Sequence, residues 1–293
     1  MIWGLLCYLM WGLFPAFFPL LQPATPMEIL AHRFVWTLVF MLLVLAAIRG
    51  FKQLRSITAR QWRTVAIAAL LISVNWGLYI YAVNNNHVAD AALGYFINPL
   101  VSVLLGVIVL GEKLRRLQFV SVGIATIAVV VLTVALGSPP VISLALAFSF
   151  GFYGLVKKQV SLTPIQSLTA ETLVLAPVGL IYLGFLQSQG TNTYVQLGAG
   201  HAALLMLAGV VTALPLLCFA RAAQEMSLTS LGMVQYITPV IQMLWAVFVN
   251  SEHIEPVRWV GFVLIWIAVI VFIVDLVALH PPRVRRVKRL GSS

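Results

Sequence analysis

The chain contains a series of apolar segments, each about as long as the ~20 residues that a helix needs to cross a bilayer. Only short polar stretches separate these segments. Of the 293 residues, 61% are hydrophobic and 9% are charged, whereas soluble domains carry about 25% charged residues. The sequence therefore predicts an all-α integral membrane protein. We expect ten transmembrane helices, at residues 2–21, 27–48, 62–82, 88–110, 117–136, 141–157, 164–186, 201–220, 227–249 and 257–279.

The Lys and Arg residues gather on one side of these helices. Of the 18 residues, only Arg258 lies in a loop on the other side, and Arg33 lies within a helix. Cytoplasmic loops carry the excess of basic residues in membrane proteins, so both termini are expected in the cytoplasm. The net charge of +10 then suits an anionic membrane surface, and no nucleic-acid partner is expected. The residues on the basic side are Arg49, Lys52, Arg55, Arg60, Arg63, Lys113, Arg115, Arg116, Lys157, Lys158, Arg221, Arg283, Arg285, Arg286, Lys288 and Arg289.

The second half of the chain repeats the first. Phe96–Val131 aligns without a gap with Tyr236–Val271, which begins 140 residues later. Apolar matches are common in membrane proteins, whereas polar residues and prolines in register indicate a real repeat. The pairs of this kind are Pro99 with Pro239 and Glu112 with Glu252.

Earlier segments repeat at nearly the same offset, because Gly12 corresponds to Gly151 and Pro26 to Pro164. Each repeat contains five helices, an odd number, so the second repeat enters the membrane from the opposite side. Such inverted repeats are typical of secondary transporters, which bind solutes in a central cavity between the two halves. The predicted units are residues 1–137, residues 138–280 and a basic cytoplasmic tail at 281–293.

Two charged residues occupy equivalent places inside the predicted helices. Arg33 stands seven residues after Pro26, and Glu171 stands seven residues after Pro164. At 1.5 Å per residue each lies about 10 Å from the start of its helix. Charged groups at this depth usually mark function. We interpret Arg33 as a clamp for a substrate carboxylate or phosphate and Glu171 as a proton-coupling group; the alternative is that both bridge helices or extend toward the membrane surface.

Two polar stripes also occupy equivalent helices, and each accompanies an in-register proline. They are favoured equally as walls of a shared cavity and as interhelical hydrogen-bonding groups. Aromatic side chains on neighbouring helices are candidates for stacking against an organic ligand. The stripes are Tyr95, Asn98 and Ser102 on one helix and Gln235, Thr238 and Gln242 on the other. The predicted substrate-binding residues are Arg33, Asn75, Trp76, Tyr79, Tyr95, Asn98, Tyr153, Gln235 and Tyr236.

Several motifs resemble those of a known transporter group. Pro99 followed by Gly111-Glu112-Lys113-Leu114 resembles the EamA branch of the drug/metabolite transporter superfamily. Glu28–Arg33, Asn75-Trp76 and Leu93–Leu100 are similar to RarD-type permeases, although Asp90 stands where glutamate is expected. The resemblance covers nearly the whole chain. It implies a location in a bacterial inner membrane, a central cavity between the two halves and transport of metabolites.

These observations predict a secondary transporter that moves a small organic, amphipathic metabolite, amino-acid-like or drug-like, by alternating access. No Gly-rich phosphate loop precedes a Lys-Ser or Lys-Thr pair, so gradients rather than ATP are expected to supply the energy. A channel or signalling subunit is the alternative. A membrane enzyme is disfavoured because no span combines a nucleophile with a base. We expect no cofactor and no metal; the partners are the solute and the lipid bilayer, and the sequence leaves monomer and homodimer open.

Overall fold

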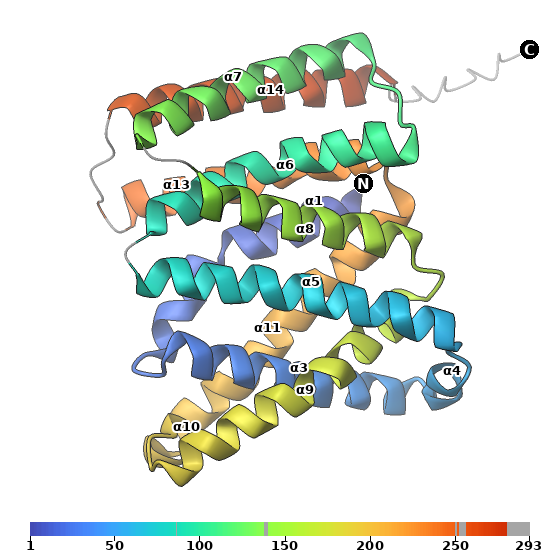
Figure 1. Cartoon of the computed structure of the whole chain (residues 1–293), viewed down its shortest axis with the longest axis vertical. Helices are drawn as coiled ribbons and strands as arrows, with labels where there is room; N and C mark the ends of the chain where they lie inside the picture. Colours follow the sequence, from blue (N-terminus) through green and yellow to red (C-terminus); the bar gives the residue numbers. More distant parts are fainter. Residues whose placement is uncertain (86, 138–139, 250, 252–255, 280–293) are drawn as a thin grey trace, which may run out of the picture.

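The computed structural model describes residues 1–85, 87–137, 140–249, 251 and 256–279, and within these residues it contains helices and no strands (Figure 1). This confirms the all-α prediction. The predicted tail, 281–293, lies outside the described residues. The helices are α1 (Ile2–Gly12), α2 (Phe14–Phe17), the 3-10 helix η1 (Phe18–Leu21), α3 (Pro26–Ala47), α4 (Phe51–Arg55), α5 (Ala59–Asn84), α6 (Val88–Leu110), α7 (Arg116–Leu136), α8 (Val141–Gln159), α9 (Pro164–Ser188), α10 (Thr193–Gln196), α11 (Gly198–Glu225), α12 (Leu228–Gln235), α13 (Ile237–Phe248) and α14 (Pro256–Leu279).

The described helices supply about ten membrane spans. Nine stretches are long and apolar enough to cross a bilayer, and Trp259–Asp275 of α14 forms a shorter apolar one. The ten predicted ranges agree with these helices to within five residues at every boundary. The protein is therefore a multi-pass membrane protein.

Two of the expected spans are interrupted helices rather than continuous ones. The first breaks at Leu13, two residues before Pro15, and the ninth breaks at Tyr236, three residues before Pro239. Proline cannot donate a hydrogen bond to the carbonyl four residues earlier, which for Pro15 is that of Trp11. The amide nitrogen of Gln242 donates to this Trp11 carbonyl at 3.2 Å. Gln242 of the ninth span thus satisfies the carbonyl that Pro15 frees in the first, as non-helical backbone within a membrane requires.

Equivalent threonines begin equivalent helices in the two repeats. Thr25 caps α3 by accepting a hydrogen bond from the Glu28 backbone at 3.2 Å, and Thr163 caps α9 by accepting one from the Gln166 backbone at 3.3 Å. A proline follows each threonine at the first helical position, where its missing N–H is not needed. The local sequence therefore determines where both helices start.

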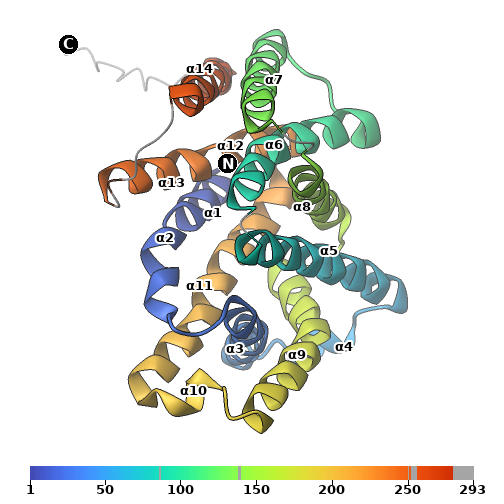
Figure 2. The same ribbon diagram turned by 60° about the vertical axis from the view of Figure 1, so that its left-hand side comes forward.

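The helices pack in pairs that join the two repeats. α3 packs against α9, α6 against α12, and α7 against α14, and each pair contains the equivalent helices of the two predicted repeats. The remaining neighbours are also matched, since α8 lies on α5 and α6 while α1 lies on α11, α12 and α13 (Figure 2). This matched packing is what a two-fold relation between the repeats would produce.

α3 and α9 run in opposite directions at the side of the bundle away from α7 and α14 (Figure 1). At the start of α3, Glu28 accepts hydrogen bonds from the Thr193 backbone at 2.7 Å and hydroxyl at 2.9 Å, just after α9 ends. At the start of α9, the Gln166 side chain donates to the Gln53 carbonyl at 2.9 Å, just after α3 ends. We call the end of the bundle where α3 begins the α3 end, and the opposite end, where α9 begins, the α9 end.

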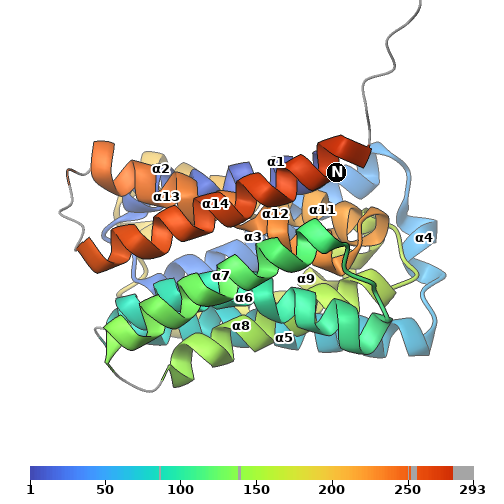
Figure 3. The same ribbon diagram turned by 90° about the horizontal axis from the view of Figure 1, so that it is seen from above.

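α7 and α14 form one edge of the molecule, which faces the viewer in Figure 3. Ser121 donates to the Ala268 carbonyl at 2.6 Å, and Arg115 forms an ion pair with Asp275. Outward-facing residues such as Val134, 75% exposed, are apolar, as contact with lipid requires.

Candidate functional site

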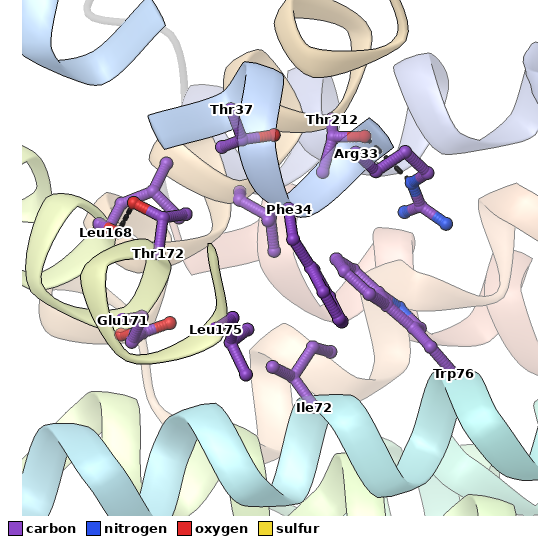
Figure 4. Close-up of a pocket in the computed structure, with 11 residues that line it drawn as sticks. Arg33, Phe34, Thr37, Ile72, Trp76, Leu168, Glu171, Thr172, Leu175 and Thr212 are labelled. Carbon is purple, nitrogen blue, oxygen red and sulfur yellow. Dashed lines mark hydrogen bonds between the residues drawn. The ribbon is translucent and has the colours of Figure 1, made fainter. Parts of the chain in front are cut away.

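A small cavity lies between α3, α5, α9 and α11, and both Arg33 and Glu171 line it (Figure 4). Figure 4 shows the two charged residues on opposite sides, with Phe34 and Leu175 between them. The cavity has room for about one water molecule. An organic solute can therefore occupy this place only after the surrounding helices separate.

Arg33 has aromatic and hydroxyl neighbours. Its Nε donates to the Thr212 hydroxyl at 2.9 Å, and its guanidinium carbon lies 4.0 Å from the Trp76 ring centre and 5.4 Å from that of Phe18. Within the described residues, Arg33 forms no ion pair, and its two terminal nitrogens make no hydrogen bond. The terminal nitrogens of a guanidinium can hold a carboxylate bidentately, so Arg33 is available for an anionic ligand.

Further aromatic residues extend this site. Trp76 stacks on Phe34, with ring centres 6.0 Å apart and an interplanar angle of 20°. Tyr79 and Tyr95 lie with ring centres 5.9 Å apart and are close to the Arg33 guanidinium. The structure thus brings together four of the predicted residues, three of them aromatic, around one cation.

Glu171 lies in a closed network of hydrogen bonds. Its carboxylate accepts from Lys157 Nζ at 2.6 Å, from the Ser167 hydroxyl at 2.8 Å and from the Tyr153 hydroxyl at 3.1 Å. Lys157 also donates to the Ser167 hydroxyl at 2.7 Å. The side chains of Lys157 and Glu171 are only 1% and 2% exposed. This is a buried ion pair in which the charge of each group is compensated.

Lys157, which the sequence placed with the basic residues of the cytoplasmic side, does not lie in an exposed loop. α8 continues to Gln159, and Lys157 points into the bundle from its last turn. The spacing held a signal for this contact, because Tyr153 and Lys157, like Ser167 and Glu171, are four residues apart and share a helix face. Two adjacent helices, each with such a polar pair, can form one buried network.

Other predicted site residues hold helices together. Asn75 donates to the Leu146 carbonyl at 2.9 Å and to the Ser149 hydroxyl at 3.1 Å, which joins α5 to α8. The Tyr236 hydroxyl donates to the Phe96 carbonyl at 3.1 Å, which joins the break of the ninth span to α6. Neither residue lines the cavity.

Asn98 and Gln235, both predicted for the cavity wall, are buried at 1% and 6% exposure and do not line the cavity around Arg33. Within the described residues, the Asn98 side-chain oxygen has no hydrogen-bond partner. Sequence reasoning missed Thr212 and Phe18, both of which contact Arg33. No pattern in the sequence marks either residue, because only the packing of α11 and η1 brings them to α3.

Comparison with known proteins identifies the family. The model of the EamA-like transporter family matches residues 1–134 and again residues 140–274. Protein RarD of Streptomyces exfoliatus is 49% identical over 277 residues, which cover 94% of this chain and 88% of that protein. The uncharacterized transporter YojE of Bacillus subtilis is 44% identical, with 92% of each chain covered. One solved structure shares the fold with a TM-score of 0.71 at 16% identity, over 95% of this chain and 98% of the other. The chain belongs to the EamA-like transporter family and, within this family, to the RarD-type permeases.

Proposed function

We propose that this protein is a secondary transporter that moves a small organic metabolite carrying an anionic group, by alternating access. The observation that carries the proposal is Arg33, a cation without a carboxylate partner among the described residues, which lines a cavity between the two halves of a membrane bundle. Its guanidinium supplies the charge, and Trp76 supplies an apolar face for the rest of the solute.

The architecture supports alternating access. The cavity is too small for a solute, so the helices around it have to separate first. α3 and α9 lie against each other in opposite directions, so opening can occur at either end around one central position. Exchange between two such openings is how inverted-repeat transporters carry a bound solute across the membrane.

We further propose that the protein lies in the bacterial cytoplasmic membrane with both termini in the cytoplasm. The distribution of Lys and Arg along the chain supports this orientation. The α3 end then faces outward and the α9 end faces the cytoplasm. Reporter domains fused to the C-terminus test it: a fluorescent reporter that matures in the cytoplasm should be active, and a reporter that requires export should be inactive.

A transporter is favoured over a channel, a signalling subunit or a membrane enzyme, because several relatives are named as transporters. Saturation separates the first two classes, since transport by a carrier reaches a maximum rate and flux through a channel rises with concentration. An enzyme would change the solute chemically, whereas a transporter releases it intact. Mass spectrometry on both sides of the membrane distinguishes these outcomes.

The deciding experiment is transport in proteoliposomes that face a defined metabolite pool, with and without an imposed pH gradient. Wild type should move one class of anionic metabolite selectively and saturably. Arg33→Ala should lose this transport, whereas Arg60→Ala, which changes an exposed arginine, should retain it. Absence of any selective movement above protein-free vesicles would overturn the proposed function, and unchanged transport by Arg33→Ala would overturn the role of Arg33.

Glu171 is our proposal for the group that couples transport to protons, and Glu171→Gln is its test. Glutamine keeps the size and hydrogen-bonding capacity of the side chain but cannot exchange a proton. The variant should still exchange solute across the membrane but should no longer concentrate it when a pH gradient is imposed. Concentration at the wild-type level would remove this role from Glu171.

A further inference from the structure

We propose that Lys157 is a second binding site for the carboxylate of the transported solute, and that Glu171 occupies this site as an internal competitor. The inference rests on the proposed function in one respect, namely that the cavity is the path of the solute. It assigns a binding role to a residue that otherwise serves only as an ion-pair partner. The class of ligand is a solute with a carboxylate group.

Lys157 occupies the position in the second repeat that is equivalent to Phe18, a contact of Arg33, in the first repeat. Gly151 follows Gly12 by 139 residues, and the same offset takes Phe18 to Lys157. Phe18 contacts Arg33, and Lys157 contacts Glu171, which is the counterpart of Arg33. The contact between Phe18 and Arg33 in the first repeat therefore corresponds to the contact between Lys157 and Glu171 in the second. Each contact contains one cation, which lies on α3 in the first repeat and on α8 in the second.

The surroundings of Glu171 already form a carboxylate-binding site. Three donors, namely Lys157 Nζ and the hydroxyl groups of Ser167 and Tyr153, surround its two oxygens at 2.6–3.1 Å. An ammonium with two hydroxyl donors would hold the carboxylate of a solute in the same way. Because Glu171 itself lines the cavity, a solute that leaves Arg33 can reach these donors once the Glu171 side chain has moved.

Because Lys157 is buried, it can exchange one anionic partner for another but cannot remain without one. Lys157 is 1% exposed, and a buried ammonium without a counter-charge is strongly destabilising. Lys157 must therefore retain one anionic partner, either Glu171 or the solute. When the Glu171 side chain turns away from Lys157, arrival of a solute carboxylate restores neutrality.

The groups that face Glu171 show which side chains can compete with a solute for Lys157. From α8 they are Lys157 and Tyr153, from α9 Ser167, from α3 Arg33 across the cavity, from α5 Ile72 and Trp76, and from α11 Thr212 and Leu216. Lys52 and Arg55 of α4, which also packs on α9, are exposed. None of these described neighbours carries a carboxylate, so Glu171 is the one carboxylate in this group of described residues. Arg33 has no such competitor, so binding there should not depend on Glu171.

Acetate tests the site without knowledge of the natural solute. In Glu171→Ala the missing carboxylate leaves space beside Lys157 that acetate can fill. Thermal unfolding of the purified protein is followed by labelling of Cys7, which is fully buried in the folded state. Sodium acetate is compared with sodium chloride at equal ionic strength. We expect acetate to raise the unfolding temperature of Glu171→Ala by several degrees, with saturation, and to leave wild type at pH 8 unchanged.

The double variant Lys157→Met/Glu171→Ala is the matched control and should not respond to acetate. If Glu171→Ala does not fold, Glu171→Gln takes its place, because its neutral amide preserves the packing but gives Lys157 no counter-charge, so that acetate can displace it. A response of the double variant equal to that of the single variant would overturn the proposal, and so would no response in either single variant. Transport by wild type in proteoliposomes is measured in parallel. Failure of all transport there would reject the proposed function. Transport by wild type, combined with no effect of acetate on the unfolding temperature of the Glu171 variants, would reject only this inference.

Discussion

The two charged sites of the cavity occupy equivalent places in the two repeats but differ in how their charge is compensated. Arg33 lies near aromatic rings, and within the described residues it has one hydrogen bond to Thr212 and no carboxylate partner. Glu171 lies seven residues into the equivalent helix and is bound by Lys157, Ser167 and Tyr153. One scaffold therefore presents a free cation near the α3 end and a neutralised pair near the α9 end.

This difference predicts how much each site contributes to the stability of the fold. A compensated pair contributes to the folded structure, and removal of one member leaves a buried charge. An uncompensated Arg33 contributes less to folding and is available to a ligand. Substitutions in the two sites should therefore differ most in their effect on stability, which should be larger at Lys157 than at Arg33.

The largest expected effect is on stability. Lys157→Met leaves Glu171 buried without its counter-ion, which should destabilise the protein by about 3–5 kcal/mol. Arg33→Met, the matched change in the other site, leaves no carboxylate unpaired among the described residues and should cost much less. Thermal unfolding of both purified variants measures the comparison. Equal losses would show that the two sites do not differ in this way.

The next effect is on transport. Arg33→Lys keeps the charge but loses the forked pair of terminal nitrogens, and Arg33→Ala loses both. Hydrogen bonds to charged groups contribute about 1.5–3 kcal/mol, so Arg33→Ala should lower the ratio of maximal rate to half-saturating concentration roughly 10- to 150-fold. Arg33→Lys should fall between this variant and wild type. A lysine variant with full activity would mean that charge alone suffices at this site.

A smaller effect is expected from the aromatic wall. Trp76→Leu removes the ring that lies 4.0 Å from the Arg33 guanidinium, and such contacts contribute about 0.5–2 kcal/mol. The half-saturating solute concentration should rise roughly 2- to 30-fold in transport assays. Trp259→Leu, which changes a partly exposed tryptophan on α14, is the control. If both variants behave alike, Trp76 has no specific role in binding.

The smallest effect concerns the orientation of Arg33. Thr212→Val removes the hydroxyl that accepts from Arg33 Nε, at a cost of about 1 kcal/mol, or roughly fivefold in solute affinity. Thr172→Val is a close control, because Thr172 lines the same cavity but its hydroxyl bonds only to carbonyls of its own helix. Transport kinetics of the two variants should differ, and identical kinetics would exclude orientation through Thr212.

Most of the fold could be predicted from the sequence, because hydrophobicity, helix start signals and the repeat are properties of the chain itself. The apolar segments predicted the spans, and Thr-Pro at 25–26 and at 163–164 determined where α3 and α9 begin. The offset between the halves also identified Arg33 and Glu171 as equivalent residues. These features depend on local chemistry, or on a comparison of the chain with itself.

What only the tertiary structure decided is which helix each polar group meets. Lys157, counted from the sequence among the basic residues of the cytoplasmic side, is the buried partner of Glu171, and Asn75, a predicted solute-binding residue, joins α5 to α8. The break at Leu13 is accommodated because Gln242 reaches the carbonyl of Trp11 across the bundle. The physical reason is that periodicity along a helix shows which face is polar, whereas a buried polar group needs a partner, and partners such as Lys157 for Glu171 come from another helix.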